Sequence, residues 1–287
     1  FAQGEQLKTI SVPILSDLDN TEQNETFLVM LSSQVNLNIT NGTATGTILI
    51  ANQAGTILIS ELRTSGPAGD GDDFVEIYNN TDTPHTVNGS SGGYGLFKMG
   101  ADCSANPVLI AVIPNGTVIP ARAHYLLTGS AYSLANYGGT NAAAGDQVLL
   151  QDIESDRNVA LFNTASLVNL STANRLDGVG FGSNTGGVCD LLREGTTLTP
   201  MSGSTLQYSY FRDECGKQGN PSTFGICPTG GFVTDANVNS EDFIFADTLG
   251  TVTPAGQRLG APGPQNASAP RQTLTVPALM LDSSVAQ

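Results

Sequence analysis

The residues best suited to chemistry lie in one acidic stretch near the C-terminal end of the sequence. Oxygen-bearing side chains recur there at every second position and end in a pair of carboxylates, in the run Asp235-Ala-Asn237-Val-Asn239-Ser-Glu241-Asp242. Ca²⁺ takes about six to eight oxygen ligands at flexible geometry, and a loop with this spacing can wrap around it. We interpret Asp235, Asn237, Asn239 and Asp242 as candidate Ca²⁺ ligands. A solvated turn is the alternative, because the run lacks the glycine and terminal glutamate spacing of a helix-loop-helix site.

Other residues with chemical potential are weaker candidates. The loop with Asp70, Asp72 and Asp73 is a second place for a cation. Only His85 and His124 could act as bases near neutral pH, and neither has a nucleophile nearby in a recognised motif. His124 lies in an alternating apolar strand, where a structural role is the better interpretation. We therefore expect a protein without enzymatic activity.

The four cysteines indicate disulfides, because they have neither the C-x-x-C spacing nor the paired histidines of a zinc site. Four cysteines allow three connectivities, and the sequence does not choose among them. We favour a local Cys215–Cys227 bridge and a long-range Cys103–Cys189 bridge. Such bridges persist in oxidising compartments, so we expect an extracellular or cell-surface protein.

Eight Asn-x-Ser/Thr sequons would accept glycans in a secretory route that glycosylates. A sequence rich in Asn and Thr also produces such triplets by chance. The candidate acceptors are Asn24, Asn38, Asn41, Asn79, Asn88, Asn115, Asn169 and Asn266.

The composition excludes several classes of partner. The net charge of −15 opposes binding to nucleic acid or to anionic lipid, while it favours solubility or attraction of Ca²⁺. No apolar run of membrane-spanning length is present, so we expect no membrane insertion. The sequence lacks an initiator Met and a signal peptide, which we interpret as a processed chain or part of a longer one.

The elements before residue 52 are four strand-like runs, at 10–14, 27–31, 35–39 and 43–50. Each shows the two-residue apolar alternation of a half-buried strand, and Asn41-Gly42 predicts a tight turn between the last two. Four short strands bury too little apolar surface to offset the chain entropy of a separate domain. We predict half of a β-sandwich that is completed by strands from elsewhere.

These residues resemble the C-terminal half of a Calx-beta domain. The resemblance lies in the run 8–17, the acidic loop that leads to Glu25-Thr26-Phe27, and the closing strand Thr45-Gly46-Thr47-Ile48. It implies an Ig-like partial module over residues 1–52. Some domains of this family bind Ca²⁺ at one tip, and the matching positions here are Asp17 and Glu22.

A second pattern begins at residue 56, with an Ile-Ser-Glu strand at 57–62, a glycine- and aspartate-rich loop, and the strand Asp-Phe-Val-Glu-Ile-Tyr-Asn at 73–79. With the Gly-Tyr-Gly-Leu run at 93–96, it resembles the lamin-tail domain, in the form found in bacterial secreted proteins. The resemblance implies a second Ig-like β-sandwich over residues 55–265, with an insertion at about 182–238. Residues 266–287 follow as a Pro/Gly linker and a C-terminal strand, 272–281, that has no partner in this module.

Together these features predict an all-β protein made of Ig-like β-sandwich modules. Our leading hypothesis is a structural or adhesive surface protein, whose half-sandwich accepts strand 272–281 from another copy or a neighbouring module and so builds a filament. The rival hypothesis is a non-catalytic, glycan- or surface-binding region of a larger secreted hydrolase or nuclease. Tyrosines that could stack on sugars in that case are Tyr94, Tyr132, Tyr137, Tyr208 and Tyr210.

Overall fold

The chain divides into two units, one of Phe1–Gln53 with Leu274–Gln287 and one of Ala54–Thr273. A computed structural model describes residues 25–36, 39–40, 42–48, 55–135, 143–201, 205–212, 235–249 and 258–270. No helix within these described ranges has the length and apolar character needed to cross a membrane.

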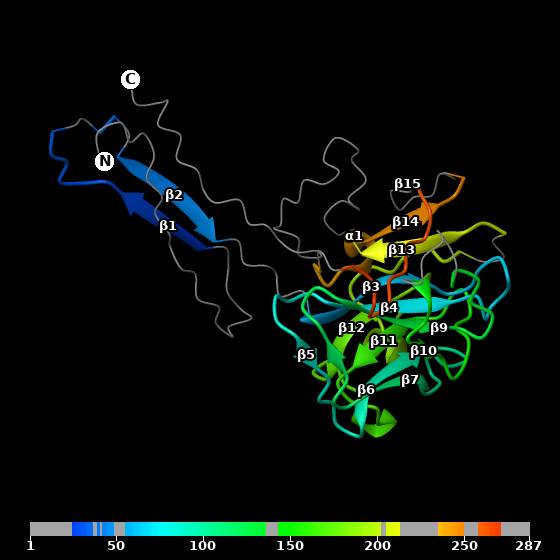
Figure 1. The fold of residues 1–287 in the computed structure, drawn as a ribbon. Coiled ribbons are helices and arrows are strands. Elements are labelled where there is room, and N and C mark those ends of the chain that lie inside the picture. The colour runs from blue at the N-terminus through cyan, green and yellow to red at the C-terminus, as the bar shows by residue number, and fades with distance from the viewer. Residues whose placement is uncertain are drawn as a thin grey trace. The chain divides into compact units, whose positions relative to one another are not determined.

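The first unit contains an antiparallel ribbon of β1 (Glu25–Met30) and β2 (Thr43–Ile48), shown in Figure 1. The register pairs Phe27 with Gly46, and a side chain at position 46 would force the Phe27 ring to move, because the ring lies over the glycine. The strand predicted at 35–39 is wrong for its described part, because Asn36 has a left-handed φ of 60° and belongs to the connection between β1 and β2. The run at 10–14 lies outside the described residues.

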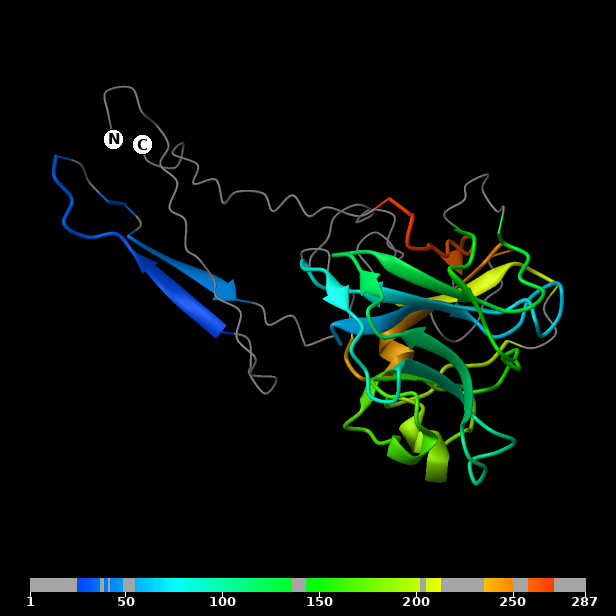
Figure 2. The same cartoon turned by 60° about the horizontal axis from the view of Figure 1, so that its bottom comes forward.

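The second unit is a β-sandwich of two layers (Figures 1 and 2). In spatial order, the seven-stranded sheet contains β10 (Gln147–Val148), β9 (His124–Thr128), β4 (Phe74–Asn79), β3 (Ile57–Arg63), β13 (Tyr208–Arg212), β14 (Phe243–Asp247) and β15 (Arg258–Leu259). The four-stranded sheet contains β12 (Arg175–Val179), β11 (Val159–Phe162), β6 (Gly93–Lys98) and β7 (Val108–Pro114). Smaller elements are the ribbon of β5 (His85–Thr86) and β8 (Val118–Ile119), the 3₁₀ turns η3 (Leu167–Asn169) and η4 (Gly187–Leu191), and α1 (Asn239–Asp242). The all-β sandwich predicted from the sequence is confirmed.

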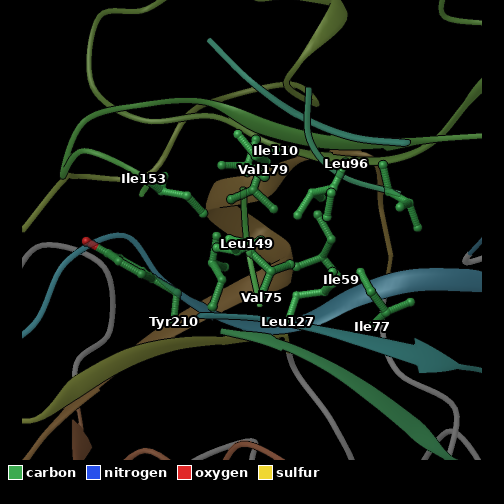
Figure 3. Packing of buried hydrophobic residues seen from close by; sticks show 14 of the residues in the cluster. Ile59, Val75, Ile77, Leu96, Ile110, Leu127, Leu149, Ile153, Val179 and Tyr210 are labelled. Atoms are coloured by element: carbon green, nitrogen blue, oxygen red, sulfur yellow. The ribbon is translucent and has the colours of Figure 1, made fainter. Parts of the chain in front are cut away.

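The core lies between the two sheets. Figure 3 shows Ile59, Val75 and Leu127 of the larger sheet facing Leu96 and Val179 of the smaller one. All five are buried, and each such side chain removed from water contributes about 1.5–3 kcal/mol to stability. The sheets are therefore fixed face to face by apolar packing.

The segment predicted as an insertion, 182–238, contributes directly to this sandwich. It contains β13, which pairs with both β3 and β14 and so is an inner strand of the larger sheet. Tyr208 and Tyr210 of β13 are buried in the core beside Phe245 of β14. An inner strand cannot be removed without splitting the sheet, so this part of the segment is not an insertion.

The end of the predicted second module and the start of the predicted linker are also packed against the sandwich. The backbone N–H of Gly263 donates to Glu61 Oε1 (3.0 Å), and that of Gln265 donates to Glu76 Oε2 (2.6 Å). Asn266 is buried and its amide donates to the Ala144 carbonyl at 2.8 Å. The segment thus covers acidic side chains of β3 and β4. The predicted strand 272–281 lies outside the described residues.

Candidate functional site

Arg212 at the end of β13 is the centre of a buried charged cluster. It shares the strand face of Tyr208 and Tyr210, so it points between the two sheets, and its side chain is 0% exposed. Its guanidinium carbon lies 4.6 Å from the centre of the Phe243 ring, within the range of a cation–π contact. The larger sheet therefore delivers a positive charge into the interior.

Asp177 of β12 delivers the matching negative charge from the smaller sheet. Arg212 Nη2 donates to both Asp177 carboxylate oxygens, at 2.7 and 2.8 Å. The pairing of β3 with β13 ends at Glu61. Beyond it, the Ile59 N–H donates to Asp177 Oδ2 at 2.6 Å, and the Ile59 carbonyl accepts a hydrogen bond from Arg212 Nε at 3.0 Å. The ion pair thus joins the two layers and satisfies the backbone groups of Ile59.

Two of the predicted Ca²⁺ ligands, Asp235 and Asp242, also contact Arg212. Its Nη1 lies 3.1 Å from Asp235 Oδ1 and 3.3 Å from Asp242 Oδ2. Asp242 also accepts hydrogen bonds from the N–H groups of Ala236 (2.6 Å) and Val238 (3.1 Å), which holds the loop before α1. These two carboxylates converge on the guanidinium of Arg212, a cation of the chain itself.

The two predicted amide ligands have other roles. Asn239 is fully buried; its Oδ1 accepts from the N–H groups of Gly180 and Glu194, and its Nδ2 donates to the Gly178 carbonyl. Asn237 is exposed, with a left-handed φ of 56°. The alternating oxygens therefore do not wrap around one point, because Asn239 is used for backbone bonding and Asn237 faces solvent.

Glu194 is the fourth carboxyl group of the cluster and was not predicted. It is 6% exposed; its Oε1 lies 3.3 Å from Arg175 Nη2, and its Oε2 has no hydrogen-bond partner. One oxygen from each of Glu194, Asp235 and Asp242 can be chosen so that all lie within 4.8 Å of one another. These three carboxylates form what we call the acidic triad.

The electrostatics of the cluster favour protons or another cation. Four carboxyl groups face the guanidinium groups of Arg212 and Arg175, so full ionisation would leave two uncompensated negative charges. Burial, with the charges of Asp177 and Asp235, raises the pKa of Glu194 to about 9. Burial also raises the pKa of Asp177 to about 6, against the lowering effect of Arg212, and raises that of Asp242.

The Asp70–Asp73 loop does not form a comparable cluster. Asp72 pairs with buried Arg63 and accepts from the backbone and the hydroxyl of Ser133 at 2.8 and 2.9 Å. Asp73 is buried and accepts from the Ile153 N–H, and burial raises its pKa to about 8. Asp70 is exposed. The carboxyl groups of Asp72 and Asp73 hold neighbouring loops in place, and these hydrogen bonds explain their positions without a bound cation.

The two histidines make local contacts. His85 Nε2 lies 2.8 Å from the Tyr94 hydroxyl, and burial lowers the His85 pKa. His124 Nδ1 lies 3.0 Å from Glu76 Oε1, and its ring packs on Tyr78.

The four described tyrosines among those proposed for sugar stacking do not form a surface platform. Tyr94, Tyr208 and Tyr210 are buried, and Tyr132 is half-buried with its hydroxyl donating to the Ala143 carbonyl. Tyr137 lies outside the described residues. The stacking proposed for Tyr94, Tyr208 and Tyr210 is not available in this arrangement.

A disulfide joins Cys103 to Cys189, the long-range pairing favoured from the sequence. Cys189 lies in η4 and packs with Phe97 and Phe162 in a second apolar cluster. The bridge therefore fixes a surface loop over the smaller sheet. Cys215 and Cys227 lie outside the described residues.

The sequons differ in access. Asn79 is 0% exposed and its amide donates to three backbone carbonyls, and Asn266 is also buried, so these two are unsuited as glycan acceptors. Asn88, Asn115 and Asn169 are exposed. The remaining acceptors Asn24, Asn38 and Asn41, like the candidate ligands Asp17 and Glu22, lie outside the described residues.

No family model matches the sequence, and no curated protein matches it significantly. Among solved structures, the chain is similar to a DUF4876 family protein from Bacteroides thetaiotaomicron VPI-5482. The identity is 14% and the TM-score 0.43, over 77% of this chain and 78% of that one.

Proposed function

We propose that this chain is a non-enzymatic structural or adhesive protein of the cell surface or extracellular space, whose copies assemble into filaments by β-strand complementation. The observation that carries the proposal is the apolar character of both faces of β1. Leu28 and Met30 on one face are 57% and 67% exposed, and Phe27 and Val29 on the other are half-buried. A strand that is apolar on both faces is typical of the interior of a folded domain.

The physical argument concerns the stability of the ribbon. A two-stranded ribbon is marginally stable in water at best, and an added strand supplies both backbone hydrogen bonds and apolar cover. Exposed apolar patches of this kind mark interaction sites. A strand from a second copy is the occupant that we propose for this surface.

The proposed donor is the segment 272–281 of that second copy. Leu274 and Val276, with the later Leu279 and Leu281, have the extended apolar spacing of a strand. Donation from each copy to the next is a head-to-tail contact that does not close on itself, so it produces a filament. The disulfide fits an oxidising compartment and supports the proposed extracellular location.

The test is sedimentation velocity of the purified chain over a wide range of protein concentration. We expect large assemblies for the natural chain, and a shift to single chains both for a chain ending at Pro270 and for the double variant Leu28→Lys, Met30→Lys. The matched control is Val168→Lys, which replaces an apolar side chain that is 89% exposed in the other unit. The proposal is wrong if the natural chain sediments as a monomer throughout, or if the truncated chain assembles equally well.

A further inference from the structure

The acidic triad lies where a metal ion would be surrounded by oxygen ligands. Ca²⁺–oxygen distances are about 2.3–2.6 Å, so oxygens around one ion lie up to about 5 Å apart. One oxygen from each of Glu194, Asp235 and Asp242 meets this condition, since the three lie within 4.8 Å of one another. The triad combines Glu194, which follows η4, with Asp235 in the loop before α1 and Asp242, the last residue of α1.

Glu194 gives the independent indication of a ligand. The residue is 6% exposed, yet its Oε2 atom has no hydrogen-bond partner. A buried, unpartnered carboxylate oxygen is costly, and native proteins rarely retain one without an unseen water or ion. This oxygen is therefore available for a metal ion without loss of an existing hydrogen bond.

Both aspartates keep an oxygen with spare capacity. Asp235 Oδ2 accepts one hydrogen bond, from the Gly55 N–H at 3.1 Å, and Asp242 Oδ1 accepts one, from Ala236. A carboxylate oxygen has two lone pairs, so each can also bind a cation. Arg212 contacts Asp235 Oδ1 and Asp242 Oδ2, the other oxygen of each aspartate.

We propose that Glu194, Asp235 and Asp242 bind one Ca²⁺ ion inside the β-sandwich unit. The ion neutralises the two negative charges that Arg212 and Arg175 leave uncompensated when all four carboxyl groups are ionised. All three ligands are hard oxygen donors, which disfavours Zn²⁺. Their burial disfavours Mg²⁺, which keeps several of its waters.

The site differs from the one predicted from the sequence. It keeps Asp235 and Asp242, replaces both amide ligands by Glu194, and uses residues far apart in the chain. Bound Ca²⁺ would hold the loop before α1 against the loop after η4, where the Asn239 N–H already donates to the Glu194 carbonyl at 3.0 Å. Because Ca²⁺ would bind the folded state and not the unfolded chain, it would stabilise the folded protein by mass action.

The test uses the full chain, freed of metal by a chelator that is then removed, and titrated with CaCl₂ in a calorimeter at pH 8. Glu194→Gln keeps the shape of the ligand but removes its charge. Glu241→Gln is the matched control, because Glu241 is an exposed carboxylate of α1, the short helix that contains Asp242. Thermal unfolding of each protein with and without CaCl₂ provides the second measurement.

We expect Ca²⁺ to bind the natural chain and Glu241→Gln with equal affinity and to raise their unfolding temperature. Glu194→Gln should lose at least about tenfold in affinity at this site, because ligand charge strongly tunes Ca²⁺ binding. Equal affinity for Glu194→Gln would overturn the proposal, since any binding would then occur elsewhere, as at Asp17 and Glu22. No heat and no thermal shift, or equal binding of Mg²⁺, would overturn it as well.

Discussion

Replacement of Arg212 by Met should destabilise the β-sandwich unit more than any surface substitution. Methionine fills much of the arginine volume but removes the charge that pairs with Asp177, Asp235 and Asp242. Asp177 is fully buried and would keep only the N–H groups of Ile59 and Gly178 as partners. Removing one partner of a buried ion pair costs about 3–5 kcal/mol, and we expect a loss in this range at pH 7.

The loss should shrink in acid. Arg212 is what lowers the pKa of Asp177 against the effect of burial, so without it this carboxyl group holds its proton to higher pH. Protonation removes the unpaired charge, so the difference between Arg212→Met and the natural chain should be smaller at pH 5 than at pH 7. For the same reason, adding Asp177→Asn to Arg212→Met should cost less than the sum of the two single changes.

The assay is urea unfolding followed by far-UV circular dichroism and by tyrosine fluorescence, since the chain has no tryptophan and Tyr208 and Tyr210 lie in the core. Arg193→Met is the matched control. Arg193 pairs with Asp190 at the surface, and such pairs contribute about 0–1 kcal/mol. A loss for Arg212→Met no larger than that of Arg193→Met would refute the assigned role of the cluster.

Three further predictions concern other parts of the sandwich. Changing Cys103 and Cys189 to Ser opens a bridge between residues 86 positions apart and should cost about 2–5 kcal/mol in urea unfolding, whereas an unchanged midpoint would show the bridge to be dispensable. Asp73 has a pKa raised to about 8, so its contribution to stability should be fully present below about pH 4. That contribution should fall by up to about 1.4 kcal/mol per pH unit as the pH rises to 8. Asp73→Asn should flatten the dependence of unfolding free energy on pH in this range, and an unaltered slope would contradict the assignment. Gly129→Ala should cost about 1–3 kcal/mol of stability, because the added Cβ would clash with Asp73 Oδ1. Gly263→Ala is the control and should be neutral, because no atom lies within 4 Å of its added Cβ. Equal melting temperatures for the two variants would refute the packing argument.

The fold class could be predicted because the strands have strong local signals. The run 57–62 is rich in Ile and Leu, the run 74–79 combines Val and Ile with Phe and Tyr, and they form β3 and β4. The partner of β2 was predicted wrongly: the Asn41-Gly42 turn favoured a hairpin with 35–39, whereas β2 pairs with β1. The runs 27–31 and 35–39 alternate equally well, and only long-range pairing distinguishes them. β13 was missed for a related reason: it is a short run, Tyr-Ser-Tyr-Phe-Arg, that ends in a charge and follows a segment without regular strands.

The cluster could be predicted only where its members are neighbours in sequence. Asp235 and Asp242 lie in one acidic run, and they do converge. Asp177, Glu194 and Arg212 come from separate elements and meet only through the packing of two sheets. Charged residues that alternate with apolar ones in a short strand, Asp177 between Leu176 and Val179 and Arg212 after Tyr208 and Tyr210, were the available signal, because a buried charge requires a partner.

Electron microscopy of the purified full chain tests the central claim, that copies complete one another's first unit by donating a strand. We expect threads for the natural chain and separate particles for the chain that ends at Pro270. Separate particles of single-chain size in both preparations would contradict the claim.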